Sequence, residues 1–134
     1  MMSAELKVLS AEYKESKIES FRELIVWQRA MQLTNVVYDL TIKFPNEEMF
    51  GLSSQMRRAA ISVASNIAEV SQRGGKKEFI HFLTIARGSL AELLTQLILA
   101  CDRNFIDKEE YNHAHDLIDE VSRMSMRLIQ SFKR

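Results

Sequence analysis

The chain has 134 residues, with 18 basic and 18 acidic side chains, and therefore carries no net charge. This length suits one domain with its own hydrophobic core, and a neutral chain implies no strong attraction of the whole molecule to nucleic acid or anionic membranes. The single Cys101 excludes an internal disulfide. Its apolar neighbours favour a small core residue over a nucleophile.

The first 20 residues differ in composition from the rest, being rich in Lys, Glu and Ser. We expect a charged arm that is either mobile or marginally helical, and either docks on a partner or extends without structure. It lacks the apolar run of a signal peptide. The longest apolar run of the chain, residues 97–101, is too short to cross a bilayer. We therefore expect a cytoplasmic protein with no membrane association.

The first helix is expected at residues 21–43, where apolar side chains recur every three or four residues. They form two rows: Leu24, Trp27, Met31, Thr34, Tyr38 and Thr41; and Val26, Ala30, Leu33, Val37, Leu40 and Phe44. Two rows give a wide apolar arc, so this helix should contact more than one neighbour. Pro45 ends the helix, and Asn46 is expected to cap the next one.

The second helix is expected at residues 51–73 and presents three surfaces. A core stripe comprises Leu52, Met56, Ala60, Val63, Ile67 and Val70. A smaller stripe of Ile61, Ala64 and Ala68 lies to one side. A polar row of Arg58, Ser62, Ser65, Glu69 and Arg73 lies roughly opposite the core stripe. The pair Gly74 and Gly75 should stop this helix.

The third helix is expected at residues 76–102, with a stripe of Phe79, Phe82, Leu83, Ala86, Leu90, Leu93, Leu97 and Cys101. Gly88 in its middle predicts close approach of the second helix. The fourth helix starts at Asp107, where Glu110 completes a capping box. Its stripe is Tyr111, Ala114, Ile118, Val121, Ser125, Leu128 and Phe132. Four helices with mostly short links predict an all-α, antiparallel, up-down-up-down four-helix bundle over residues 21–134.

Two Glu-x-x-His pairs, Glu78–His81 and Glu110–His113, resemble the ligand pattern of di-iron bundles. They lie near the starts of antiparallel helices, so on the order of 30 Å should separate them within one chain. We therefore expect no metal site and no cofactor. Gly-rich phosphate loops and Ser–His–acid combinations are also missing from the sequence. We expect no catalytic residue and no enzymatic activity.

Positive charge is concentrated in residues 51–88. This segment contains six basic residues and only two acidic ones, Glu69 and Glu78, so its net charge is +4. The bases are the candidate nucleic-acid-binding residues: Arg57, Arg58, Arg73, Lys76, Lys77 and Arg87. Those near the turn between the second and third helices lie beside backbone amides that can hold a phosphate. With few contacts, such binding would be weak and sensitive to salt. Solvated charges or ion pairs explain the same residues.

The first and second helices have more apolar surface than a monomeric bundle requires, which favours self-association. The candidate interface residues are Ile61, Ala64, Ala68, Arg58 and Glu69. Heterologous contacts around a closed ring would bury these rows without free edges.

Several motifs occur together within residues 21–105. They are Val26-Trp27-Gln28, Phe44-Pro45 followed by Glu48 and Gly51-Leu52, Gln55-Met56-Arg57-Arg58-Ala59, Asn66-Ile67-Ala68-Glu69, and Ala86 through Glu92. With these motifs, the chain resembles the four-helix-bundle family that is named after proteins encoded in 23S ribosomal RNA intervening sequences. The resemblance implies a bundle that assembles into a homopentameric ring. A related branch, the accessory variability determinant proteins of diversity-generating retroelements, is basic and binds nucleic acid and a reverse transcriptase. This chain differs from the shared pattern in its neutral charge, its arm, and Val70 in place of a glycine.

Two hypotheses follow. The chain is a ring-forming accessory protein that binds RNA, DNA or a nucleic-acid-processing protein, or it is a protein–protein scaffold whose arginines form ion pairs between subunits.

Overall fold

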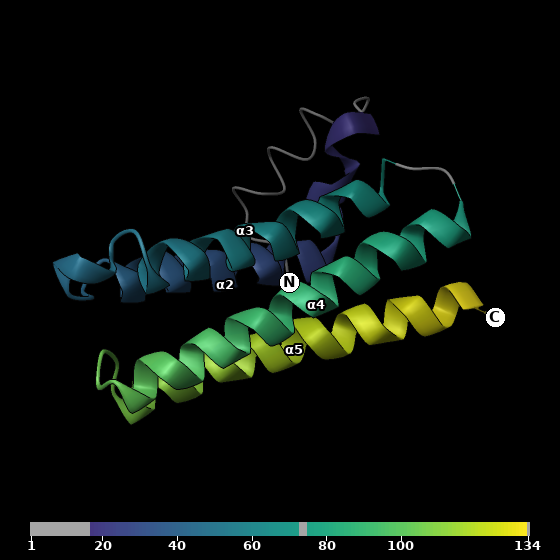
Figure 1. The fold of residues 1–134 in the computed structure, drawn as a ribbon. Coiled ribbons are helices and arrows are strands. Elements are labelled where there is room, and N and C mark those ends of the chain that lie inside the picture. The colour runs from purple at the N-terminus through teal and green to yellow at the C-terminus, as the bar shows by residue number, and fades with distance from the viewer. Residues whose placement is uncertain (1–16, 73–74, 134) are drawn as a thin grey trace.

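The computed structural model describes residues 17–72 and 75–133, and four α-helices account for most of this part of the chain. They are α2 (Ile25–Thr41), α3 (Leu52–Val70), α4 (Lys76–Asp102) and α5 (Lys108–Lys133), with short 3₁₀ helices η1 (Lys17–Glu23) and η2 (Asn46–Glu48). The helices run alternately up and down (Figure 1), and α2 and α4 each contact both α3 and α5. The antiparallel four-helix bundle expected from the sequence is confirmed.

Most members of the apolar stripes face the shared core, as predicted, whereas Met31 and Tyr38 of the first predicted row on α2 are exposed. The six members of the α3 stripe are at most 9% exposed. On α2 the buried row is Val26, Ala30, Leu33, Val37 and Leu40, and Phe44 continues it beyond the helix. On α4 and α5 the buried members are Leu83, Ala86, Leu90, Leu93, Leu97, Ala114, Ile118, Val121 and Ser125. Cys101 is half-buried against this core. The helical period therefore predicted most of the packing.

The start of the first helix differs from the prediction. Leu24 has an extended backbone, with ψ of 121°, which separates η1 from α2. In one continuous helix, Phe21 and Trp27 would lie on different faces, because six residues turn the chain through roughly 600°. The break instead brings their rings to 5.1 Å between centroids. The expected boundary at residue 20 therefore falls inside η1, and residues 1–16 of the arm lie outside the described part of the chain.

Asn46 does not cap α3, which corrects the second expectation for this region. The residues after Pro45 form η2, and α3 begins only at Leu52. The Leu52 backbone N–H donates to Glu48 Oε1 at 3.3 Å. The carboxylate of Glu48 thus satisfies one of the amides that a helix start leaves unpaired.

Gly88 does not mark a close helix contact, so this prediction is wrong. The residue is exposed, and a β-carbon added there would meet no atom of a neighbouring helix within 4 Å among the described residues. Gly75, in contrast, has φ of +147°, a conformation that side-chain-bearing residues rarely adopt. It directly precedes α4 and starts that helix in the direction opposite to α3.

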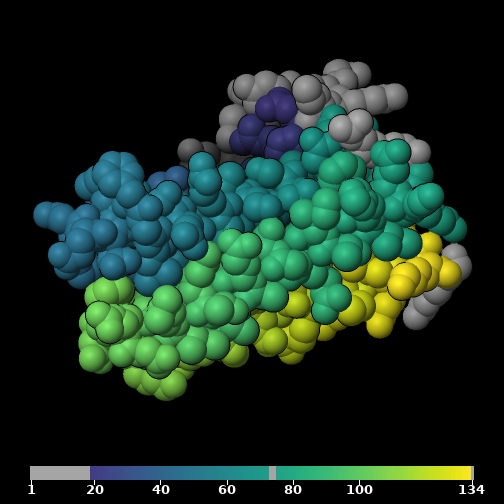
Figure 2. Space-filling view, in the orientation of Figure 1, coloured from purple at the N-terminus to yellow at the C-terminus, as the bar shows by residue number. Residues whose placement is uncertain are grey.

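α4 is long and apolar enough, by length and composition alone, to cross a membrane. Figure 2 shows it across the face of the bundle that meets the viewer, and it packs there against α3 and α5. The core helix of a soluble bundle meets the same criteria. This property is therefore weak evidence for a membrane.

The capping box at the start of α5 is confirmed. The Glu110 N–H donates to Asp107 Oδ1 at 2.7 Å, and the Asp107 N–H donates to Glu110 Oε1 at 3.0 Å. Lys43 Nζ also pairs with Glu110 Oε2, which ties the end of α2 to the start of α5. The hydrogen bond from Lys43 and the one with Asp107 lower the pKa of Glu110 below its ordinary value of 4.5.

We predict that the ionised Glu110 carboxylate stabilises the fold and that this stabilisation disappears at acidic pH. A lowered pKa in the folded state stabilises the fold above the unfolded pKa, and the effect is lost as pH falls through the folded value. Glu110→Gln should therefore reduce the free energy of unfolding near pH 7 and have progressively less effect below pH 4.5. Urea denaturation from pH 3 to pH 7 measures this, with Glu109→Gln on the exposed side of the same turn as control. A pH-independent difference would contradict the assignment.

A second prediction concerns Ser125, which is fully buried and whose hydroxyl has no hydrogen-bond partner among the described residues. An unpaired buried hydroxyl costs free energy that alanine avoids. Ser125→Ala should raise the free energy of unfolding by about 1 kcal/mol. Thermal denaturation checks this against Ser122→Ala, one turn away on α5 and half-buried. A lower melting temperature for Ser125→Ala would show that the hydroxyl is satisfied.

Candidate interaction surfaces

The predicted polar row on α3 does not form a single surface. Arg58 and Ser65 are exposed, Ser62 and Glu69 are half-buried, and Arg73 lies outside the described residues. α3 also ends at Val70, before the predicted position. The row therefore contributes two exposed side chains to solvent rather than a continuous strip.

Ser62 belongs to the contact between α3 and α4, which corrects its placement opposite the core. Its hydroxyl lies 2.8 Å from the hydroxyl of Ser89 on α4. Asn66 Nδ2 donates to the Ser62 carbonyl oxygen at 2.8 Å, one turn along α3. These small polar side chains join the two helices where Gly88 was expected to do so.

The predicted side stripe on α3 is unevenly accessible. Ile61 is 44% exposed, whereas Ala64 is 6% exposed. Ala68 is half-buried. Within this stripe, Ile61 is the side chain that can contact another molecule over much of its surface.

Ile61 lies beside an apolar row on the outer surface of α2. Met31, Tyr38 and Ile42 are exposed, and their spacing of seven and four residues places them on one side of the helix. α2 and α3 approach closely here, because the Thr34 hydroxyl reaches the Ala60 carbonyl oxygen at 3.3 Å. We call the surface formed by Met31, Tyr38, Ile42 and Ile61 the α2–α3 face.

The two ends of the α2–α3 face differ. At the η2 end, Ile42 and Met49 line one cleft of about 230 Å³, and the neighbouring Phe50 is 93% exposed. At the other end, η1 packs on both α2 and α3, with Phe21 against Trp27. The chain therefore covers one end of its own apolar surface and leaves the other accessible. The sequence carried a signal for this, since Ile42, Met49 and Phe50 are large apolar residues around a loop.

Arg57 lies at the edge of this face in a defined position. Its guanidinium stands over the Tyr38 ring, 4.7 Å from the centroid, and its Nε donates to Thr41 Oγ1 at 2.9 Å. A cation over an aromatic ring is attracted by the ring's quadrupole, and the hydrogen bond fixes the planar head. These contacts orient Tyr38 and Arg57 together at the surface.

The six candidate basic residues do not gather in one place. Arg57 points toward α2, its neighbour Arg58 is exposed, and Arg87 lines a cleft between α4 and α5. Lys76 and Lys77 are exposed at the start of α4, which lies at the opposite end of the bundle from the start of α3 (Figure 1). Arg57 and Val70 are 13 residues apart on α3, or roughly 20 Å. Arg73 is not among the described residues.

The two Glu-x-x-His pairs lie apart, because α4 and α5 begin at opposite ends of the bundle (Figure 1). Within residues 17–72 and 75–133, no group of three or more His, Cys, Asp or Glu side chains could hold a metal ion.

Comparison with known proteins identifies a family. The sequence pattern of the 23S rRNA-intervening sequence protein family matches residues 22–127. No curated protein matches the chain. Among solved structures, the fold is similar to a protein of unknown function from the S23 ribosomal protein family of Bacteroides thetaiotaomicron. The two chains are 24% identical, with a TM-score of 0.74 over 79% of this chain and 96% of the other. The family match covers most of the four helices, and the chain therefore belongs to the 23S rRNA-intervening sequence protein family.

Proposed function

We propose that this chain is a non-enzymatic scaffold that associates with copies of itself through the α2–α3 face, in a closed ring. The observation that carries the proposal is the accessible part of that face. Ile42 is 76% exposed, the other three members of the face are also exposed, and Phe50 beyond its η2 end is 93% exposed. A cluster of large apolar side chains on a soluble protein marks an interaction site far more often than scattered single residues do.

The composition of the face supports a protein partner. Tyr, Met and Arg are enriched in protein–protein interfaces, and the face presents Tyr38, Met31 and the oriented Arg57. The aromatic side chain of Tyr38 is held by Arg57, so little side-chain entropy is lost when a partner covers Tyr38. The resemblance to the family favours five copies in the ring.

Substituting Ile61 with Glu should dissociate the oligomer, because the substitution places a charge in the middle of the apolar face. The wild-type chain should be an oligomer at micromolar concentration. Ile61→Glu should raise the dissociation constant of the oligomer at least about tenfold, so that the measured mass moves toward that of the monomer. Light scattering coupled to size exclusion measures the mass, and circular dichroism confirms that the helices remain.

The matched control is Ile98→Glu, because Ile98 on α4 is 43% exposed, almost the same as Ile61. It should leave the oligomer intact. If Ile98→Glu dissociated the oligomer and Ile61→Glu did not, the contact between subunits would involve α4 instead of the α2–α3 face. A monomeric wild-type chain would rule out self-association altogether.

A second candidate function is weak binding of nucleic acid at the start of α4. Lys76 and Lys77 are exposed there, and the residue at the N-cap position, Gly75, has no side chain that could cap the amides of this helix start. Such amides and cations together attract phosphate. Since Arg57 and Arg87 point elsewhere, few phosphates would be contacted, and the affinity would be low.

This candidate predicts salt-sensitive binding that depends on the lysines. Fluorescence anisotropy with structured RNA and with duplex DNA should show saturable binding at low salt. Replacing Arg73, Lys76 and Lys77 with Ala should weaken it and reduce the salt slope by about one per lost phosphate contact. Replacing Lys108 and Lys133 on α5 is the control. Absence of binding at low salt, or equal binding by both variants, would contradict this function.

A further inference from the structure

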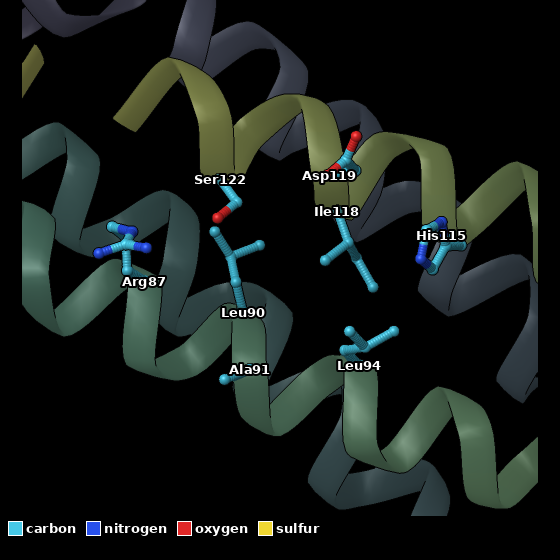
Figure 3. Close-up of a pocket in the computed structure, with 8 residues that line it drawn as sticks. All are labelled: Arg87, Leu90, Ala91, Leu94, His115, Ile118, Asp119 and Ser122. Carbon is cyan, nitrogen blue, oxygen red and sulfur yellow. The ribbon is translucent and has the colours of Figure 1, made fainter. Parts of the chain in front are cut away.

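A cleft of about 220 Å³ lies between α4 and α5, away from the α2–α3 face. Figure 3 shows the residues that line it. Arg87 and Ser122 lie at one end, and His115 lies at the other. Leu90, Leu94 and Ile118 form an apolar floor between them. The cleft therefore combines a cation and a hydroxyl with a hydrocarbon surface.

Arg87 has an unusual environment in this cleft. Its Nε is buried and has no hydrogen-bond partner within the part of the chain that the structure describes. A buried donor without a partner loses its hydration and gains nothing in return. The Ser122 hydroxyl lies at the same end of the cleft (Figure 3) and supplies a second donor there. Two donors thus lie at one end of the cleft, and one of them, Arg87 Nε, has no acceptor among the described residues.

The nearby acidic group does not satisfy Arg87. Asp119 lines the cleft, but its Oδ2 pairs with Arg123 Nη2 at 2.9 Å. Its charge is directed to the exposed side of α5. An Asp at the rim also disfavours a dianion, because two like charges close together repel each other. The acceptor that fits is therefore a single negative charge.

We propose that this cleft binds a small monocarboxylate with a short apolar body. Its carboxylate accepts hydrogen bonds from Arg87 and Ser122, and its hydrocarbon part lies on Leu90, Leu94 and Ile118. The planar guanidinium matches a carboxylate in geometry as well as charge. The volume is below the range of about 300–1,000 Å³ that is typical for drug-sized ligands, which limits the ligand to a small acid.

The test is isothermal titration of the full-length chain with benzoate and with 3-methylbutanoate. Benzamide, which has nearly the same shape without the charge, and inorganic phosphate are compared. Both acids should bind saturably, and benzamide should bind at least about tenfold more weakly, because a charge-assisted hydrogen bond is lost. Amide chemical shifts of Ser122 should move on addition of benzoate, and those of Ile61 should not.

Variants assign the site. Arg87→Met keeps an unbranched side chain of similar helix propensity but removes the guanidinium, and should weaken benzoate binding at least about tenfold. Ser122→Ala should weaken it less, and provides an independent readout if Arg87→Met does not fold. Arg58→Met removes an exposed arginine from α3 and should leave binding unchanged.

Four results would overturn the proposal, of which the first three concern the two acids. They are no saturable binding of either acid up to about 20 mM, equal affinity for benzoate and benzamide, and benzoate binding that Arg87→Met and Ser122→Ala leave unchanged. Tighter binding of phosphate than of both acids would also overturn it, because the cleft would then be a general anion site. None of these outcomes depends on the oligomeric state.

Discussion

The constraint on which the bundle depends is that each helix must bury one apolar stripe against two neighbours. Val63 on α3 and Leu93 on α4 have no exposed surface. Once they face inward, the helical period fixes the direction of all the remaining side chains on their helices. Ile61, two residues before Val63, is turned by roughly 160° and reaches the outer surface. Arg87, three residues before Leu90, is turned by only roughly 60° and reaches the cleft beside α5. The core therefore decides which side chains are available for binding.

The sequence predicted most of what depends on a regular local pattern, with the cap expected at Asn46 as an exception. The stripes follow from hydrophobic period, and the capping box of Asp107 and Glu110 follows from two residue types at one spacing. The break at Leu24 could not be found in this way, because a contact between Phe21 and Trp27 accompanies it rather than a local breaker. Gly88 gave a false signal, since a missing side chain is equally compatible with a close neighbour and with solvent.

The candidate site shows the limit of counting charges along a chain. Residues 51–88 carry a net charge of +4, but the net charge does not say in which direction each side chain points. Arg57 and Arg58 are adjacent, and one turns toward Tyr38 on α2 while the other is exposed. Lys76 and Lys77 begin the next helix at the far end of the bundle. Antiparallel connection thus separates charges that the sequence brings together, and a strongly basic surface does not result. The exposed apolar residues were easier to anticipate, because a surplus of apolar surface is a property of whole helices.

The two proposed surfaces differ in the force that would operate on each, and this has a consequence for how they interact. Association through Ile61 and its apolar neighbours depends on removal of hydrocarbon surface from water, which added salt weakens little. Binding of a carboxylate by Arg87 depends on a charge pair that is only partly shielded from solvent, so ionic strength screens it. α2 and α4 do not adjoin in the cyclic order of the bundle, which places the two surfaces on different helix pairs. A ligand in the cleft would reach the assembly surface only through a shift of α4 against α3, where Ser89 contacts Ser62 only two residues from Arg87. The bundle core transmits such a shift only if its stripes repack, so weak coupling is the expectation from a core in which Leu90 and Leu93 are at most 2% exposed.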